Sequence, residues 1–353
     1  MNLNNLSLYG RQYNYQTPYV QTFNLMTQEQ FTNHDSFQIG YVGALGRHLD
    51  NYYNTLNSAS VILPVGTPLV SKLSNGQINA AATYLPFPHF AANTTYETTN
   101  ATSSYNALQT TYEHQFNLGL SMLANYTFSK CLSDQRTQAK NAPNYRAPWL
   151  PGFGIGADYS LCDVDVTHVV HMAGTYELPV GRGRMFASNT NRWLDAVIGG
   201  WDVNFIYTYQ SGQPFNIACA TSTTADFGCN ANVVQGQGLY EGAHTQKQWL
   251  NPAAFATPPT AAAIGQANTS PLGSVGQQAR GPGFNNLDSS LFKNFTFTEA
   301  LRLQFRAEAF NTANTAQFAQ PGSLNYTNTS SFSSITSLRN GPRVLQLALK
   351  LFY

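Results

Sequence analysis

Residues 343–353 read RVLQLALKLFY, and this stretch decides the fold. Every second side chain is a large apolar one, while Gln346 and Lys350 lie on the opposite parity. A period of two is that of a β-strand, because successive side chains of a strand point to opposite faces. A helix would scatter the apolar set around its axis. The residues on the apolar face are Leu345, Leu347, Leu349, Leu351 and Tyr353.

The length of this strand fits a bacterial outer membrane. Eleven residues at roughly 3.3 Å each span about 36 Å, and a tilt of about 40° brings that close to the ~25 Å apolar band of a transmembrane barrel. The apolar face would then contact lipid, and the polar face would line the lumen. The alternative for one strand alone is the last strand of a soluble sandwich, so the rest of the chain has to decide.

The composition favours a lipid-facing wall over a soluble surface. Charged residues are 10% of the 353 residues, against roughly 25% in soluble domains, whereas Phe, Tyr and Trp make up 13%. So little charge would make a soluble protein prone to association. The formal net charge of +1 argues against nucleic acid as a partner. No run of 18 apolar residues is present, which excludes a transmembrane helix.

The same alternation recurs along the chain and predicts nine strands of an antiparallel transmembrane β-barrel. If Tyr353 lies in the periplasm, the long connections 44–103, 130–165, 212–286 and 312–342 all fall outside the cell. The shorter ones, 31–33, 115–117, 179–200 and 298–300, then fall inside, as bacterial barrels require. A soluble sandwich has no reason to sort its loops in this way. The predicted strands are residues 19–30, 35–43, 104–114, 118–129, 166–178, 201–211, 287–297, 301–311 and 343–353.

The start of the sequence, MNLNNLSLYGRQ, lacks the basic and apolar regions of a signal peptide. Single-chain bacterial barrels have an even number of strands, whereas nine are predicted here. Both observations lead us to expect that residues 1–353 are the C-terminal fragment of a longer exported barrel.

Short motifs occur along the whole chain: PYVQ at 18–21, GYVG at 40–43, GRHL at 46–49, YNALQ at 105–109, NYTFSK at 125–130, YELP at 176–179, GGW at 199–201, SGQP at 211–214, NPAAF at 251–255, GPG at 281–283 and FRAEAFN at 305–311. Together, in this order, they resemble the C-terminal barrel portion of TonB-dependent outer-membrane receptors of the Oar-like type, without the plug and the first barrel strands. The resemblance implies a complete receptor with a plug, a barrel of roughly 22 strands and a contact to the TonB complex through that plug. It also implies a ligand for uptake, either a carbohydrate oligomer or a siderophore.

No catalytic or metal centre is predicted, and no cofactor. His168 and His171 are three residues apart on a strand and so point to opposite faces, which prevents them from sharing a metal there. No nucleophile elbow and no phosphate-binding loop occurs. The protein is therefore not expected to be an enzyme.

The four cysteines suggest two disulfides in an oxidising compartment. Cys131 and Cys162 stand at the two ends of one predicted extracellular loop, and Cys219 and Cys229 lie within the next loop. The alternative is four free thiols in a cytosolic protein, which the barrel interpretation disfavours.

Charged side chains on the polar parity of the last strands have two interpretations. They could form a ligand path or a wall against a plug, or they could form a ladder of salt bridges inside the lumen. We favour the ladder, since a function has to be argued from a site. The residues are Arg302, Gln304, Arg306, Glu308, Gln346 and Lys350.

These observations predict an outer-membrane receptor barrel for ligand binding and uptake, in contact with membrane lipid. The terminal strand resembles the segment that the barrel-insertion machinery reads by strand pairing. A surface adhesion or structural barrel without import is the alternative, and a soluble sugar-binding sandwich is a third hypothesis.

Overall fold

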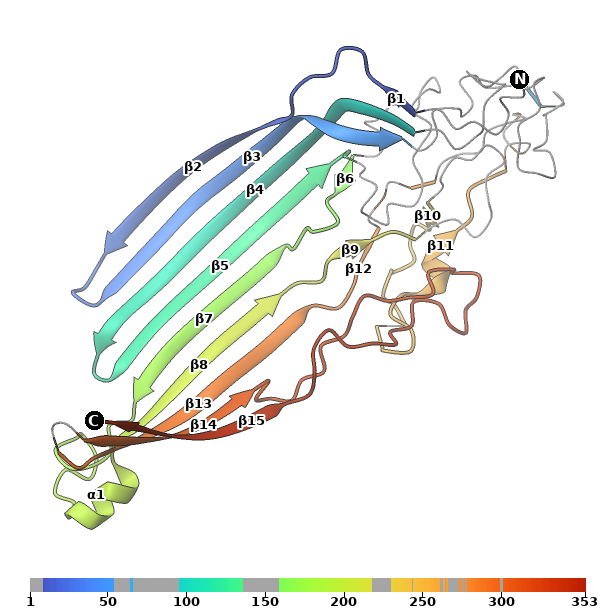
Figure 1. Ribbon diagram of the computed structural model, residues 1–353. Coiled ribbons are helices and arrows are strands. Elements are labelled where there is room, and N and C mark those ends of the chain that lie inside the picture. The colour runs from blue at the N-terminus through green and yellow to red at the C-terminus, as the bar shows by residue number, and fades with distance from the viewer. Residues whose placement is uncertain are drawn as a thin grey trace.

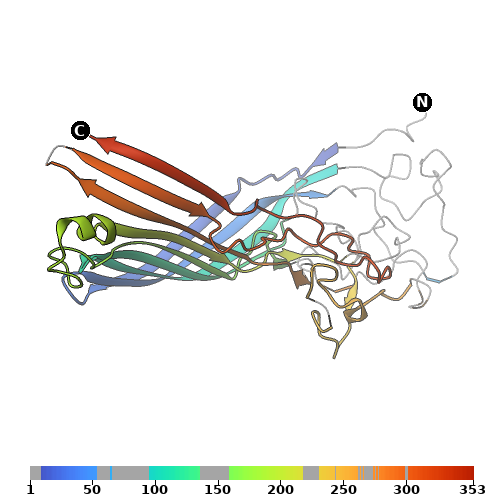
Figure 2. The same cartoon turned by 90° about the horizontal axis from the view of Figure 1, so that it is seen from below.

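The computed structural model describes residues 9–53, 64–65, 95–135, 159–217, 230–242, 244–260, 263, 265, 273–274, 276, 278–298 and 301–353. Nine strands of the described chain lie side by side in sequence order and form one antiparallel, curved sheet (Figures 1 and 2). They are β2 (Tyr19–Gln30), β3 (Asp35–Tyr53), β4 (Thr95–Asn117), β5 (Leu120–Ser133), β7 (His168–Glu177), β8 (Trp201–Gln210), β13 (Phe284–Thr296), β14 (Arg302–Phe310) and β15 (Val344–Phe352).

The predicted all-β antiparallel fold is confirmed, and each of the nine predicted strands has a counterpart. The sheet is not closed, because β2 and β15 are its two edges and do not pair with each other. Two short strands extend it, as β1 (Tyr9–Arg11) pairs in parallel with β4 and β6 (Ser160–Leu161) pairs with β5.

Two strands continue well into the predicted loop 44–103. β3 runs on to Tyr53 and β4 begins at Thr95, and their ladder is maintained through two register shifts, between Gly46 and Leu49 and between Leu49 and Asn51. The sequence there is rich in Asn and Thr, which do not alternate with apolar residues. The extension is stabilised by tertiary contacts instead, since Arg11 forms an ion pair of 2.9 Å with Glu97.

Two connections at the opposite end also differ from the expectation. The β4–β5 turn is formed by Leu118 and Gly119, and not by residues 115–117. Both have positive φ, 50° and 86°, which two-residue hairpin turns require and which glycine adopts without strain. The connection 179–200 contains a helix, α1 (Arg192–Ile198), which the sequence analysis did not predict.

The buried hydrophobic cluster of the described chain lies in the loop segments and not against the sheet. It consists of Ile217, Ala231, Leu250, Ala254, Phe255, Ala279, Tyr326 and Phe332. The leucines of β15 are left open, with Leu345 and Leu349 each 70% exposed. No described helix is long and apolar enough to cross a membrane.

Cross-strand register assigns the two faces, because directly paired residues of neighbouring strands lie on the same face. Leu303, Phe305 and Ala307 of β14 pair with Leu351, Leu349 and Leu347 of β15. Gln304 pairs with Lys350 and Glu308 with Gln346. The apolar face continues through Leu291 of β13 and Val203 of β8.

A charge at Leu349 and a charge at Gln346 should have different effects. Leu349→Arg places a cation on the apolar face near the middle of β15, which should cost about 2–4 kcal/mol in a membrane. Gln346→Arg is the matched control, because its side chain lies beside Glu308 on the polar face. Outer-membrane fractionation and heat-modifiability of the full-length protein measure the result. Equal losses would show that lipid does not distinguish the two faces.

Candidate functional site

The polar face of β14 and β15 gathers all six charged or amide residues singled out in the sequence. Pairing puts Arg302 opposite Phe352, Gln304 opposite Lys350 and Glu308 opposite Gln346, with Arg306 between them on the same face. We call this set, Arg302, Gln304, Arg306, Glu308, Gln346 and Lys350, the polar wall.

The favoured salt-bridge ladder is wrong for the described residues, because none of the cations of the polar wall lies within ion-pair distance of Glu308. Arg302 and Lys350 instead lie 4.5 Å and 4.8 Å from the ring centre of Phe352. Arg306 lies 4.7 Å from that of Phe292. The open polar face leaves few acids for these cations, so the positive charge is directed to aromatic rings.

A chain of amide hydrogen bonds ties the polar wall to the next strands. Arg306 donates from Nε to Gln304 Oε1 at 2.7 Å, and Gln304 donates to Asn294 Oδ1 at 2.9 Å. Asn294 in turn donates to Asp202 Oδ2 at 2.7 Å, so that one network crosses β14, β13 and β8. Such a network holds donors and acceptors in fixed positions on the polar face.

At the other end of the sheet, the described loop segments fold into a small body with its own core, which we call the loop cap. It contains four short strands, β9 (Pro214–Phe215), β10 (Asn232–Val233), β11 (Phe255–Ala256) and β12 (Ala279–Arg280), and a 3₁₀ helix at Pro252–Ala254. β9 pairs with β12 and β10 with β11. The loop that precedes β15 contributes Tyr326 and Phe332 to the core.

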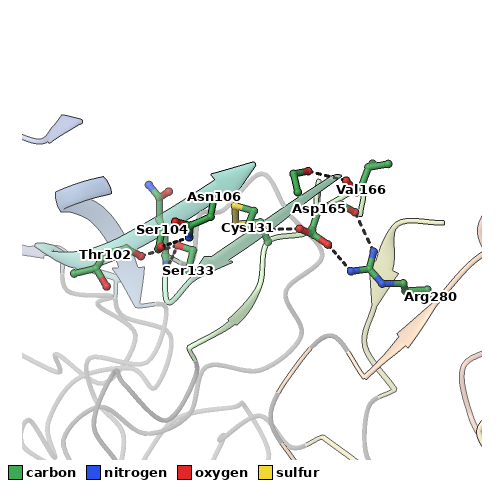
Figure 3. Close-up of a disulfide and its surroundings, with 11 residues drawn as sticks. Thr102, Ser104, Asn106, Cys131, Ser133, Asp165, Val166 and Arg280 are labelled. Carbon is green, nitrogen blue, oxygen red and sulfur yellow. Dashed lines mark hydrogen bonds and ion pairs between the residues drawn. A yellow bond between two sulfur atoms is a disulfide. The ribbon is translucent and has the colours of Figure 1, made fainter. Parts of the chain in front are cut away.

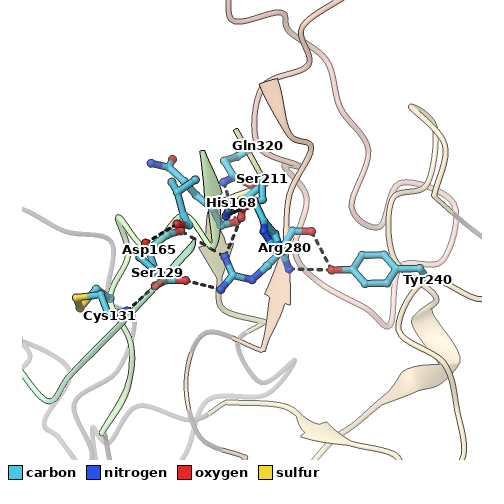
Figure 4. A network of polar contacts seen from close by, with 12 residues as sticks. Ser129, Cys131, Asp165, His168, Ser211, Tyr240, Arg280 and Gln320 are labelled. Carbon is cyan, nitrogen blue, oxygen red and sulfur yellow. Dashed lines mark hydrogen bonds and ion pairs between the residues drawn. A yellow bond between two sulfur atoms is a disulfide. The ribbon is translucent and has the colours of Figure 1, made fainter. Parts of the chain in front are cut away.

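Arg280 connects the loop cap to the sheet. Its carbonyl accepts hydrogen bonds from Tyr240 Oη at 3.0 Å and from Trp249 Nε1 at 2.8 Å, both of which belong to the cap. Its guanidinium turns the other way, donates to the Gly212 carbonyl at 2.9 Å and forms an ion pair with Asp165 (Figure 4). Burial raises the pKa of the Tyr240 hydroxyl, which therefore stays protonated and able to donate.

Asp165 links this contact to the strands below. Its Oδ1 accepts from the Cys131 backbone N–H at 2.6 Å, and its side chain is only 1% exposed (Figure 3). Ser129 donates from Oγ to the Val166 carbonyl at 2.9 Å and holds the same segment on β5. Asp165 and Arg280 are 115 residues apart, and no local pattern in the sequence could have paired them.

Cys131 and Cys162 are joined by a disulfide with their Cα atoms 5.4 Å apart, beside this junction (Figure 3). The Cys162 backbone N–H also donates to the Cys131 carbonyl at 3.0 Å. The disulfide therefore fixes the position at which the chain leaves β5 and returns toward β7. Cys219 and Cys229 lie outside the described residues.

The histidines do not gather into a metal site. His168 packs against Phe128, at 5.2 Å between ring centres, while His171 lies 3.3 Å from the Thr208 hydroxyl on the other face. Within the part of the chain that the structure describes, no group of His, Cys, Asp and Glu could hold a metal ion.

The family model of the outer membrane beta barrel domain matches residues 1–346. The chain belongs to this family. An outer membrane β-barrel of this kind resides in the bacterial outer membrane, where the apolar face of the sheet meets lipid and strands replace helices as the membrane-crossing elements.

Two solved transporters are similar to this outer membrane β-barrel at low identity. The outer membrane transporter YddB from Escherichia coli shares 9% identity and a TM-score of 0.44, over 99% of this chain and 34% of that one. The ferric citrate transporter FecA, solved in its unliganded form, shares 11% identity and a TM-score of 0.39, over 94% and 31%. The chain thus spans about a third of their length. No curated protein matches the sequence.

Two disulfides are expected in the mature protein. Non-reducing peptide mapping should recover Cys131 linked to Cys162, and Cys219 linked to Cys229, because each pair belongs to a single predicted extracellular loop. Recovery of Cys131 linked to Cys219, or alkylation of all four thiols without reductant, would contradict this pairing.

Loss of the Asp165 charge should loosen the loop cap. Asp165→Asn should cost about 2–3 kcal/mol, less than the ~3–5 kcal/mol of breaking a fully buried pair, because Arg280 remains partly exposed. Limited proteolysis of intact cells should then cleave the cap faster than in the wild type. Glu241→Gln, an exposed cap residue, is the control. Equal cleavage of the two variants would mean that Asp165 does not hold the cap.

Proposed function

We propose that this chain forms the C-terminal part of the barrel of a TonB-dependent outer-membrane receptor of the Oar-like type. The complete receptor binds a ligand outside the cell and imports it. Membership in the outer membrane β-barrel family supplies the location. The short motifs from PYVQ to FRAEAFN supply the receptor type, since the two solved transporters are too distant to carry an argument.

The observation that carries this proposal is that one chain contains both the polar wall and a folded loop cap. The wall presents cations, aromatic rings and amides on the face opposite the lipid-facing leucines. The cap is anchored to the sheet through Arg280 and Asp165, and its shape is held by a hydrophobic core. A selective receptor needs such an ordered surface, because flexible loops lose affinity when they become ordered on binding.

The open edges of the sheet fit this role as well. In lipid every backbone N–H and C=O must be paired, so an open edge cannot face the hydrocarbon. Further strands would therefore pair with β2 and with β15 and complete the barrel. The plug that contacts the TonB complex would occupy the lumen beside the polar wall.

The ligand class is narrowed to molecules that present polar groups to such a wall. Cations beside aromatic rings suit the anionic, oxygen-rich surface of a ferric siderophore, and aromatic rings with amides suit the hydroxyl faces of a carbohydrate oligomer. A surface adhesion barrel remains the second candidate, because a folded cap also offers a rigid contact surface to another cell.

Uptake separates the two candidates. The complete gene product is expressed in the outer membrane of cells that lack related receptors. The cells receive either a hydroxamate siderophore loaded with radioactive iron or a radiolabelled xylo-oligosaccharide. Import predicts accumulation of one probe that a protonophore abolishes, because TonB-dependent transport consumes the proton gradient of the inner membrane.

Two results would contradict import. One is binding of a probe to cells that is unaffected by the protonophore and never becomes protected from washing. The other is an upstream reading frame without a plug or a TonB-contacting segment. Either result would favour the adhesion barrel.

A further inference from the structure

The connection between β7 and β8 carries an unusual surface for a turn at the periplasmic end of a barrel. It lies beyond the strand ends, beside the C-terminus and opposite the loop cap (Figure 1). Five of its apolar side chains are largely exposed: Met185 by 80%, Phe186 by 57%, Trp193 by 74%, Leu194 by 49% and Val197 by 66%. The connection 179–200 also contains three arginines and a single aspartate.

This connection is a folded unit. Asn191 caps α1 by accepting hydrogen bonds from the backbone N–H groups of Trp193 and Leu194, at 3.1 Å and 2.9 Å. Asp195 accepts from the Arg182 backbone N–H at 2.6 Å and so ties α1 to the preceding turn. A Cβ at Gly181 would lie 2.7 Å from Asp195 Oδ1, so this close approach requires glycine. The single acidic side chain is thus used within the fold.

The C-terminal end of α1 is attached to the lipid-facing side of the sheet. Trp201 donates from Nε1 to the Val197 carbonyl at 2.9 Å, and Lys293 donates from Nζ to the Gly199 carbonyl. Trp201 and Lys293 are a directly paired couple on the same face as Leu291. The C-terminal end of α1 therefore lies on the side of the sheet that carries the apolar face.

The positive charge of the connection is placed beside these apolar groups. Arg192 lies 5.0 Å from the ring centre of Trp193, and Arg182 is exposed. Arg184 is partly neutralised by an ion pair of 3.2 Å with Glu177. A hollow of about 710 Å³ lies beside α1, and its lining includes Arg182, Arg192, Trp193 and Lys293. The carboxylates Glu177, Asp195 and Asp202 line it as well, of which Glu177 pairs with Arg184, Asp195 accepts from the Arg182 backbone N–H and Asp202 accepts from Asn294.

We propose that the connection 179–200 binds anionic phospholipid of the periplasmic leaflet, with Trp193, Leu194 and Val197 among the acyl chains and Arg182 and Arg192 at the headgroup phosphate. Tryptophan next to arginine is the composition of a membrane interface, where the ring spans the apolar and polar layers. Charge complementarity selects an anionic lipid, since each arginine near an anionic surface contributes to binding. The inference rests on the proposed function for the periplasmic orientation of this end.

Lipid binding to the complete receptor in neutral detergent tests this. Native mass spectrometry, with phosphatidylglycerol and phosphatidylcholine as the two probes, should show tighter binding of phosphatidylglycerol. Arg182→Gln with Arg192→Gln should weaken phosphatidylglycerol binding about 30-fold, because each arginine near an anionic surface strengthens binding by a factor of about five. The pair Arg182→Lys and Arg192→Lys keeps the charge and should retain most of the preference. Lys247→Gln, an exposed cation in the loop cap, should change nothing.

Trp193→Ser with Val197→Ser probes the apolar half and should weaken binding of both lipids. Heat-modifiability confirms that each variant is folded. Equal binding of the two lipids to the wild type, or unchanged binding by the glutamine pair, would overturn the proposal and leave the surface to a plug or a periplasmic protein. Displacement of phosphatidylglycerol by millimolar inorganic phosphate would also overturn it, because it would indicate a site for free anions.

The outcome is independent of the uptake experiment. Normal uptake with no preference for phosphatidylglycerol would remove only the lipid site. Selective lipid binding without uptake of any probe would remove only the receptor function.

Discussion

The pairing of backbone N–H and C=O groups between neighbouring strands is the constraint on which this structure depends. Hydrocarbon offers no partner to these groups, so a wall in lipid must satisfy them through its own ladders. The nine-strand meander does so across its whole width, leaving only β2 and β15 with an open side. Once the register is fixed, every side chain is assigned to one face, because a shift of a single residue would exchange the two faces.

The two faces use their charges differently. On the polar wall, cations rest against the rings of Phe352 and Phe292 and leave Glu308 unpaired among the described residues. On the apolar side, the cation Lys293 lies at the end of the strands beside α1, where it donates to a backbone carbonyl. A cation is acceptable there because it is buried beneath α1, where the Gly199 carbonyl accepts its hydrogen bond and the rings of Trp201 and Phe295 lie within about 5.5 Å of it.

The segments at the two ends of the sheet are stabilised by different interactions. The loop cap has a hydrophobic core, and it is joined to the sheet by the disulfide and by the contact between Asp165 and Arg280. The connection 179–200 has no buried residue in its helix and is held by hydrogen bonds through Asn191 and Asp195. The first arrangement keeps the loop cap in one shape, whereas the second leaves the apolar side chains of the connection exposed.

The sequence by itself determined the nine long strands of the sheet and their two faces, because alternation with a period of two is a local property of neighbouring residues. In β15 the leucines at 345, 347, 349 and 351 predict the lipid-facing side directly, and β2 was predicted with its observed bounds. Contacts between distant residues could not be predicted in the same way. Three features depend on groups that the curvature and register of the sheet bring together. They are the extension of β3 and β4, the ion pair of Asp165 with Arg280, and the hydrogen bond from Trp201 to the C-terminal end of α1. Only the tertiary structure decides these contacts, since the backbone ladder fixes which residues far apart in the chain become neighbours.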